Sequence, residues 1–181
     1  MVVVLMLGLG AVAQAHELAH SVHPDAPAQT EQFAFLVGDW DCAMKALTPD
    51  GKDTVEIQAQ WSGRYILGGW AIQDHWYSER SGVGGWGTNI RWWNTEISRW
   101  ENSWLNSRAN DRIHYYSDQV GETMVMIGGE GDSAFGPYVD RNTFFDISEA
   151  AFRWRKDRSF DGGESWVENV SAMLCTQREA S

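Results

Sequence analysis

The sequence predicts an all-β protein: a single up-and-down antiparallel β-barrel of about ten strands, preceded by a short helical plug. Aromatic residues, which favour strands, are abundant, with 11 Trp, 7 Phe and 5 Tyr among 181 residues. Short segments of alternating apolar and polar residues recur along the chain, and each ends at Gly, Asn or Asp, which are typical of tight turns. Closing the sheet leaves no unpaired edge strand, so a barrel is the favoured arrangement of these hairpins.

Length and charge restrict the possible functions. The chain is long enough for one domain with a substantial core and short for two. Its formal net charge is -11, whereas nucleic acids and anionic membranes are bound by positive surfaces. We therefore expect a protein that does not bind nucleic acid. Its expected oligomeric state is a monomer or a homodimer.

The amino-terminal segment, residues 1–15, predicts export. It is an apolar run too short to span a bilayer, and it ends in Ala13-Gln14-Ala15, a small-residue pattern typical of signal-peptidase sites. No Lys or Arg precedes the apolar run, which departs from the usual signal peptide. We expect a periplasmic or secreted protein without stable membrane insertion after cleavage; the alternative is a buried N-terminal strand.

Residues 16–32 predict a flexible linker. The linker opens with His16-Glu17-Leu18-Ala19-His20, a spacing that places two imidazoles on one face of an internal helix for zinc. Here the motif directly follows the predicted cleavage site, where a third ligand and a supporting shell are hard to provide. His16 and His20 are therefore weak candidate metal ligands, and we expect no resident metal.

The barrel domain is predicted over residues 33–178. Its entry is the stretch from Phe33 to Cys42, in which a short helical turn near 31–37 leads into Gly38 and then Trp40, the residue expected to close the base of the barrel. Runs rich in Gly, Asn and Asp separate the strands that follow. The predicted strands cover residues 39–47, 53–61, 64–78, 86–94, 97–105, 111–118, 122–130, 141–147, 151–157 and 165–175.

Alternation along these strands predicts a pocket. Trp70, Asp74 and Trp76 share one face of the segment 64–78, and Trp100, Asn102 and Trp104 share one face of the segment 97–105. An inner wall of aromatic rings with a few polar groups is typical of a barrel that binds a small hydrophobic or amphipathic molecule. We take these six residues as candidate ligand-binding residues. The alternative is a barrel filled by its own tryptophans.

The two cysteines lie in the first and last predicted strands, Cys42 and Cys175. These strands are neighbours in a closed barrel, so a disulfide between them is possible, and an oxidising compartment would allow it. Two buried free thiols are the other interpretation.

Several short motifs resemble the lipocalin (calycin) superfamily. Gly38-Asp39-Trp40 resembles its Gly-x-Trp signature, and Arg178 is the nearest candidate for the late Arg that covers this Trp in that family. The sequence is most similar to the bacterial lipocalin-like domains of the DUF1579 group. The likeness covers residues 33–175 through four motifs: Phe33 to Trp40, Ile66-Leu67-Gly68-Gly69-Trp70, Gly85-Trp86-Gly87 with Trp92-Trp93-Asn94, and Trp100-Glu101-Asn102-Ser103-Trp104. It implies a barrel of fatty-acid-binding-protein or nitrobindin type, and no established activity.

A nitrobindin-like barrel would hold haem through one histidine late in the chain. No histidine follows His114, and only His75 and His114 lie within the barrel region. A lone strand histidine is more often a surface residue than a ligand, so we expect no cofactor.

An acid–base enzyme of the cyclase or isomerase kind is the alternative function. A carboxylate held among aromatic rings has a raised pKa and can transfer protons, and Asp74 and Glu168 are the candidates. Either could instead form a structural ion pair with Arg64 or Arg91. The sequence has no Gly-x-Ser-x-Gly elbow, phosphate-binding loop or dinucleotide fingerprint.

One basic cluster, Arg153 to Arg158, interrupts the otherwise acidic sequence. It is interpreted as an outward strand face balanced by acids, or as a contact for an anionic head group at the barrel mouth. The function that we expect is binding of a small hydrophobic or amphipathic molecule, without catalysis.

Overall fold

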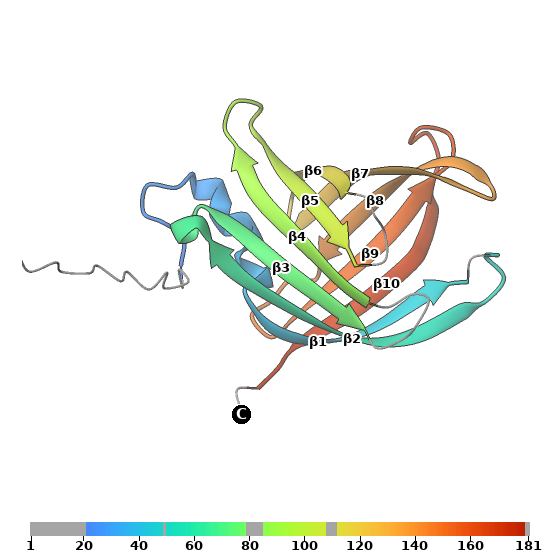
Figure 1. Cartoon of the computed structure of the whole chain (residues 1–181), viewed down its shortest axis with the longest axis horizontal. Helices are drawn as coiled ribbons and strands as arrows, with labels where there is room; N and C mark the ends of the chain where they lie inside the picture. Colours follow the sequence, from blue (N-terminus) through green and yellow to red (C-terminus); the bar gives the residue numbers. More distant parts are fainter. Residues whose placement is uncertain (1–20, 49, 79–84, 108–111, 180–181) are drawn as a thin grey trace, which may run out of the picture.

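The computed structural model describes residues 21–48, 50–78, 85–107 and 112–179, and the predicted signal peptide, His16 and His20 lie outside them. The described chain forms a closed antiparallel barrel in which each strand pairs with its neighbours in sequence and the first strand pairs with the last (Figure 1). The predicted fold class is confirmed. The strands are β1 (Gly38–Leu47), β2 (Thr54–Ile66), β3 (Ala71–Ser78), β4 (Gly85–Asn94), β5 (Arg99–Asn106), β6 (Arg112–Val120), β7 (Thr123–Ser133), β8 (Gly136–Phe145), β9 (Ala151–Ser159) and β10 (Val167–Gln177).

Closure of the barrel joins β1 to β10, and the register places Cys42 opposite Cys175. These two residues form a disulfide, and both side chains are buried. The bond therefore links the two ends of the sheet covalently across 133 residues of sequence.

The prediction of one continuous strand over residues 64–78 is wrong, because a turn interrupts this segment. Residues Leu67–Gly69 form the short 3₁₀ turn η2, with Gly68 at φ 66° and Gly69 at φ 96°, conformations that glycine adopts readily. A Cβ on Gly69 would lie 2.5 Å from the backbone of Ser21 and of His23, so the segment before the barrel packs directly on this turn. Strand β2 therefore ends at Ile66, and β3 begins at Ala71.

The other 3₁₀ helix, η1 (Ala28–Leu36), covers one end of the barrel (Figure 1). It starts earlier than predicted, so residues 28–32 belong to the plug instead of the linker. Phe33 and Leu36 are fully buried, and Gly63 of β2 allows the close approach, since a Cβ there would lie 2.1 Å from the Leu36 carbonyl oxygen. No helix among the described residues is long and apolar enough to cross a membrane.

Trp40 lies at the plugged end and is 2% exposed. Its indole N–H donates to the Leu36 carbonyl at 3.2 Å, and its ring meets the edge of Phe152 at 5.0 Å. The expectation that Arg178 covers this ring is wrong: Arg178 is paired with Asp41, whose side chain is largely exposed on β1.

Candidate functional site

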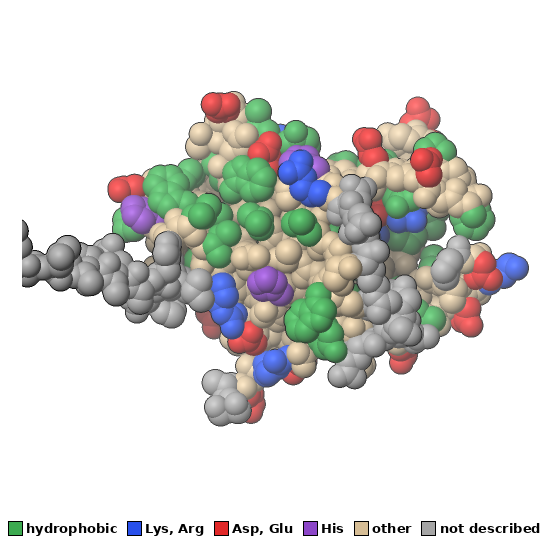
Figure 2. Space-filling model, viewed as in Figure 1, with side chains coloured by type: hydrophobic (Ala, Val, Ile, Leu, Met, Phe, Trp, Pro, Cys, Tyr) green, Lys and Arg blue, Asp and Glu red, His purple; other side chains and the backbone are tan. Residues whose placement is uncertain are grey.

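A cavity of about 740 Å³ occupies the barrel and opens at the end opposite η1. Its opening is surrounded by three loops, which contribute Gly51 of the β1–β2 hairpin, Phe135 of the β7–β8 turn and Phe160 after β9. Figure 2 shows the surface hollowed between these projecting hairpins, with acidic side chains on the surrounding loops. The walls are mainly aromatic and thioether side chains, including Trp61, Trp76, Trp104, Trp154, Met44 and Met173.

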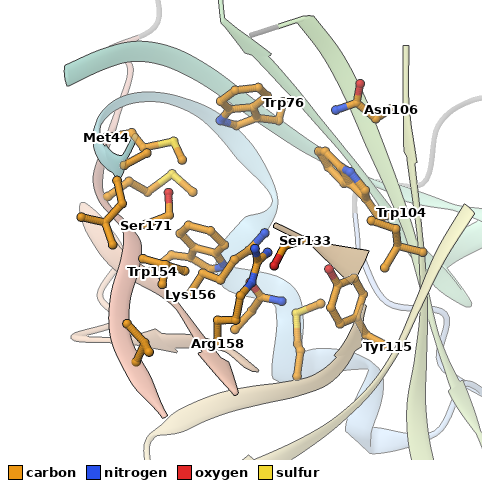
Figure 3. Close-up of a pocket in the computed structure, with 18 of the residues that line it drawn as sticks. Met44, Trp76, Trp104, Asn106, Tyr115, Ser133, Trp154, Lys156, Arg158 and Ser171 are labelled. Atoms are coloured by element: carbon orange, nitrogen blue, oxygen red, sulfur yellow. The ribbon is translucent and has the colours of Figure 1, made fainter. Parts of the chain in front are cut away.

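Two of the six predicted ligand-binding residues, Trp76 and Trp104, line the cavity (Figure 3). Trp76 points inward from β3, and Trp104 points inward from β5. The ring of Trp104 crosses the neighbouring strand at Gly87, where a Cβ would lie 2.1 Å from the ring. Gly87 thus creates the space for this indole.

Asp74 and Asn102 lie behind the inner end of the cavity and hold Arg91. The Arg91 guanidinium donates through Nε to Asp74 Oδ2 at 2.5 Å and through Nη1 to Asn102 Oδ1 at 3.1 Å. All three side chains are nearly inaccessible to solvent, and of the three only Arg91 lines the cavity. Burial raises the pKa of Asp74, although the adjacent Arg91 charge opposes the shift. The predicted structural ion pair of Asp74 is therefore formed, with Arg91 as its partner.

Trp70 and Trp100 do not line the cavity. Trp70 follows the η2 turn, is 44% exposed and stacks on His23 at 5.4 Å, because the interruption of the strand takes it out of the inward-facing row. Trp100 is fully buried against the plug, with its ring edge-on to Phe33 at 4.8 Å and its N–H bonded to Gln32. Trp100 contributes to the base of the barrel.

The histidines in the barrel region face away from the cavity. His75 is exposed and alternates along β3 with the buried Asp74 and Trp76. His114 packs against Tyr116, whose exposed ring lies outside the barrel, at 4.8 Å. Neither offers a ligand to a haem inside the barrel, and the described residues contain no cluster of His, Cys, Asp or Glu suited to a metal.

Glu168, the second candidate acid, is exposed at the start of β10. A register shift separates Val167 from Ser171, and Asn169 within it has φ 56°. On β10 the inward row includes Ser171 and Met173, and Val167 and Val170 of the irregular stretch also line the cavity. Neither Glu168 nor Asp74 lines the cavity, so neither is placed to exchange protons with a molecule inside it.

The basic cluster of β9 divides between the two faces of the strand. Arg153 and Arg155 pair with Asp146 and Asp157, whereas Lys156 and Arg158 line the cavity (Figure 3). The sequence predicted the whole cluster either as an outward face or as a contact at the barrel mouth, and it did not single out these two residues. The row Trp154, Lys156, Arg158 carries the necessary signal, because alternate residues of a strand share a face.

Asp140 of β8 holds the two inward cations. Arg158 donates to both of its carboxylate oxygens, at 2.7 and 3.0 Å, and Lys156 Nζ lies 3.4 Å from Oδ2. Burial alone would lower the pKa of Lys156, but the nearby oxygens of Tyr115 and Asp140 raise it above its usual value. Burial raises the pKa of Tyr115, so this lining phenol stays neutral beside a charged ammonium at neutral pH.

Comparisons with known proteins identify the fold. No protein-family model matches the sequence, and no curated protein matches it either. The chain is structurally similar to the S-type phycobiliprotein lyase CPES from Guillardia theta, with a TM-score of 0.52, 10% identity, and coverage of 84% of this chain and 92% of that one. It is also similar to Rv2717c from M. tuberculosis, with a TM-score of 0.55, 9% identity, and coverage of 86% and 100%. At these identities the likeness shows a lipocalin-like barrel and carries no further conclusion about the ligand.

Proposed function

We propose that the protein binds one small hydrophobic or amphipathic molecule inside the barrel, without chemical change to it. The cavity carries this proposal: its volume of about 740 Å³ lies within the range of small-molecule sites. One end is sealed by η1 and the other is open, so a ligand has one route of entry. A barrel filled by its own tryptophans would leave no such space.

The composition of the walls indicates how the ligand is held. Burying about 400 Å² of apolar surface, counted over ligand and walls, contributes on the order of 10 kcal/mol. Loss of ligand motion and ordering of side chains offset several kcal/mol of this. We therefore expect dissociation constants in the micromolar range for a molecule that fills the cavity.

The cavity also offers polar contacts. Among the side chains that line it are Tyr115 and Ser171, whose hydroxyl groups can each donate and accept a hydrogen bond. A donor and an acceptor of this kind fix the orientation of a ligand that carries polar groups.

We further propose that the protein acts after export, in the periplasm or outside the cell, and that it belongs with the DUF1579 lipocalin-like domains. The buried disulfide supports the first proposal, because such bonds persist in oxidising compartments. The motifs from Phe33 to Trp104 support the second.

Titration with N-phenyl-1-naphthylamine, an uncharged aromatic dye that fluoresces in apolar surroundings, tests the binding function. Ala46 points into the cavity from β1, whereas Ala43 of the same strand is exposed on the outside. We expect one dye molecule to bind per wild-type chain. Ala46→Trp should bind the dye at least about tenfold more weakly, because its added indole occupies the cavity, and Ala43→Trp should bind it as the wild type does. Equal binding to all three proteins, or none to the wild type, would contradict the proposal.

A further inference from the structure

We propose that the bound molecule carries a single negative charge, of the carboxylate type, and that Lys156 and Arg158 bind it. This inference rests on the proposed function, because it specifies the polar end of a ligand in the same cavity. Both residues project from β9 toward the centre of the cavity, beside Trp154 and across from Trp76 and Trp104 (Figure 3).

The charges around the cavity leave one positive charge uncompensated. Asp140 is the only carboxylate paired with Lys156 or Arg158 among the described residues, so two cations share one anion. Deeper in the barrel, Arg91 and Asp74 balance one another. Among the described lining residues the only acid is Asp50, which is exposed on the β1–β2 hairpin and is bonded to Thr48.

Both cations have donors left for a ligand. The Lys156 ammonium has three N–H groups, and Asp140 is its only carboxylate partner among the described residues. Arg158 engages Asp140 through Nε and Nη2, which leaves Nη1 without a partner in the described chain. The Tyr138 ring lies 3.5 Å from the Arg158 guanidinium carbon and holds the group in place. Arginine and lysine donors held in this way are suited to a carboxylate.

The excess of one charge selects a monoanion. A neutral ligand would leave the cationic pair uncompensated beside an apolar wall, and a dianion would leave a negative charge there. The acidic loops around the opening also disfavour more highly charged ligands, although salt screens such exposed charges over about 10 Å. Lys156 and Arg158 are only about one-quarter exposed, so salt screens their charges less than those of the loops.

Displacement of N-phenyl-1-naphthylamine by three ligands with the same alkyl chain tests the inference. Dodecanoate, dodecanol and dodecyl phosphate are compared at pH 8 and below their micellar concentrations, where they carry one, zero and about two negative charges. We expect dodecanoate to bind at least about tenfold more tightly than dodecanol, because it gains charge-assisted hydrogen bonds, and more tightly than dodecyl phosphate.

Two variants change the charge count in opposite directions. Lys156→Met removes the excess charge, so we expect the preference for dodecanoate over dodecanol to fall to about twofold or less. Asp140→Asn doubles the excess, so dodecyl phosphate should gain about tenfold relative to dodecanoate. Arg153→Met removes an outward cation of the same strand, paired with Asp146, and should leave both ratios at their wild-type values. If Asp140→Asn does not fold by circular dichroism, Lys156→Met decides alone.

The outcomes separate this inference from the proposed function. If the dye binds but dodecanol displaces it as well as dodecanoate does, or dodecyl phosphate binds best, the monoanion site is wrong and the cavity remains a binding site. Retention of the dodecanoate preference in Lys156→Met would also overturn the assignment. If the dye itself does not bind the wild type, the proposed function fails.

Discussion

At the scale of single residues, Arg91 forms the inner end of the cavity, where its guanidinium lies over the Phe33 ring of η1. Its side chain is 1% exposed, and a buried guanidinium is tolerated only when its charge and its N–H groups are satisfied. Asp74 supplies the opposite charge, and Asn102 and the Met126 sulfur accept from Nη1. Asn89, with its amide turned to suit its neighbours, accepts from Nη2 at 2.9 Å and donates to the Ser103 carbonyl.

This arrangement predicts that Asp74→Asn is strongly destabilising. Removing one partner of a buried ion pair leaves an uncompensated charge, so we expect the free energy of unfolding to fall by about 3–5 kcal/mol. Urea denaturation measures the change. The double variant Asp74→Leu/Arg91→Met removes both charges and should lose less than the single variant. A loss below about 1 kcal/mol in Asp74→Asn would show that the pair is not needed.

The positions of single side chains were predictable from the sequence only in part. Alternation correctly placed Trp76 and Trp104 inward, because a strand side chain is either on one face or on the other. It could not distinguish a residue that lines the cavity from one buried behind it, such as Asp74 or Asn102. That difference depends on which neighbouring strand supplies a long side chain, here Arg91, to cover them.

At the scale of elements, the turn between β9 and β10 is organised by Asp161. Its carboxylate accepts from the Ser159 hydroxyl at 2.6 Å, the Ser165 hydroxyl at 2.5 Å and the Ser165 N–H at 2.9 Å. These hydrogen bonds favour the ionised form and hold the pKa of Asp161 well below its usual value of 3.8. The turn in this way orients the start of β10 at the opening of the cavity.

We expect the contribution of Asp161 to stability to depend on pH. Because its pKa is lower in the folded than in the unfolded chain, the stabilisation is fully present above about pH 4 and is lost as the pH falls further. Asp161→Asn should therefore be less stable than the wild type at pH 7, and the difference should shrink toward pH 3. Thermal unfolding at both values measures it. Glu164→Gln, in the same turn, controls for loss of an exposed charge, and a difference independent of pH would contradict the assignment.

Two features of the elements were not predictable from local pattern. The sequence Leu67-Gly68-Gly69 fits either a strand or a turn, and its packing against Ser21 and His23 makes it a turn. The outward position of Glu168 could not be read from alternation either. Glu168 shares a row of β10 with Leu174, which is 41% exposed, and pairing with β1 and β9 decides which row of the strand faces inward. Both depend on contacts between distant parts of the chain.

At the scale of the whole molecule, closure of the barrel depends on the pairing of β1 with β10. Alternation and turn residues were enough to predict the ten strands and their up-and-down order, and closure then made Cys42 and Cys175 neighbours. Alternation predicted a pocket but not which tryptophans line it, because the tryptophans divide between two roles. Trp40 and Trp100 fill the base against η1, whereas Trp76, Trp104 and Trp154 line open space.

The disulfide should stabilise the closed barrel as a whole. It spans 133 residues, and removing it restores the conformational freedom of the unfolded chain. We expect Cys42→Ala/Cys175→Ala to lower the free energy of unfolding by about 2–5 kcal/mol while it keeps the barrel circular dichroism spectrum. Denaturation of the oxidised wild type and the variant gives the comparison. Equal stability would show that the strand pairing closes the barrel without help from the bond.

The most direct test of the central claim is a crystal structure of the wild-type protein grown with dodecanoic acid. We predict electron density for one molecule inside the barrel, with its alkyl chain against Trp154 and Met173 and its carboxylate at Lys156 and Arg158. A barrel whose interior is closed by its own side chains, or a ligand bound only on the outer surface, would contradict the account.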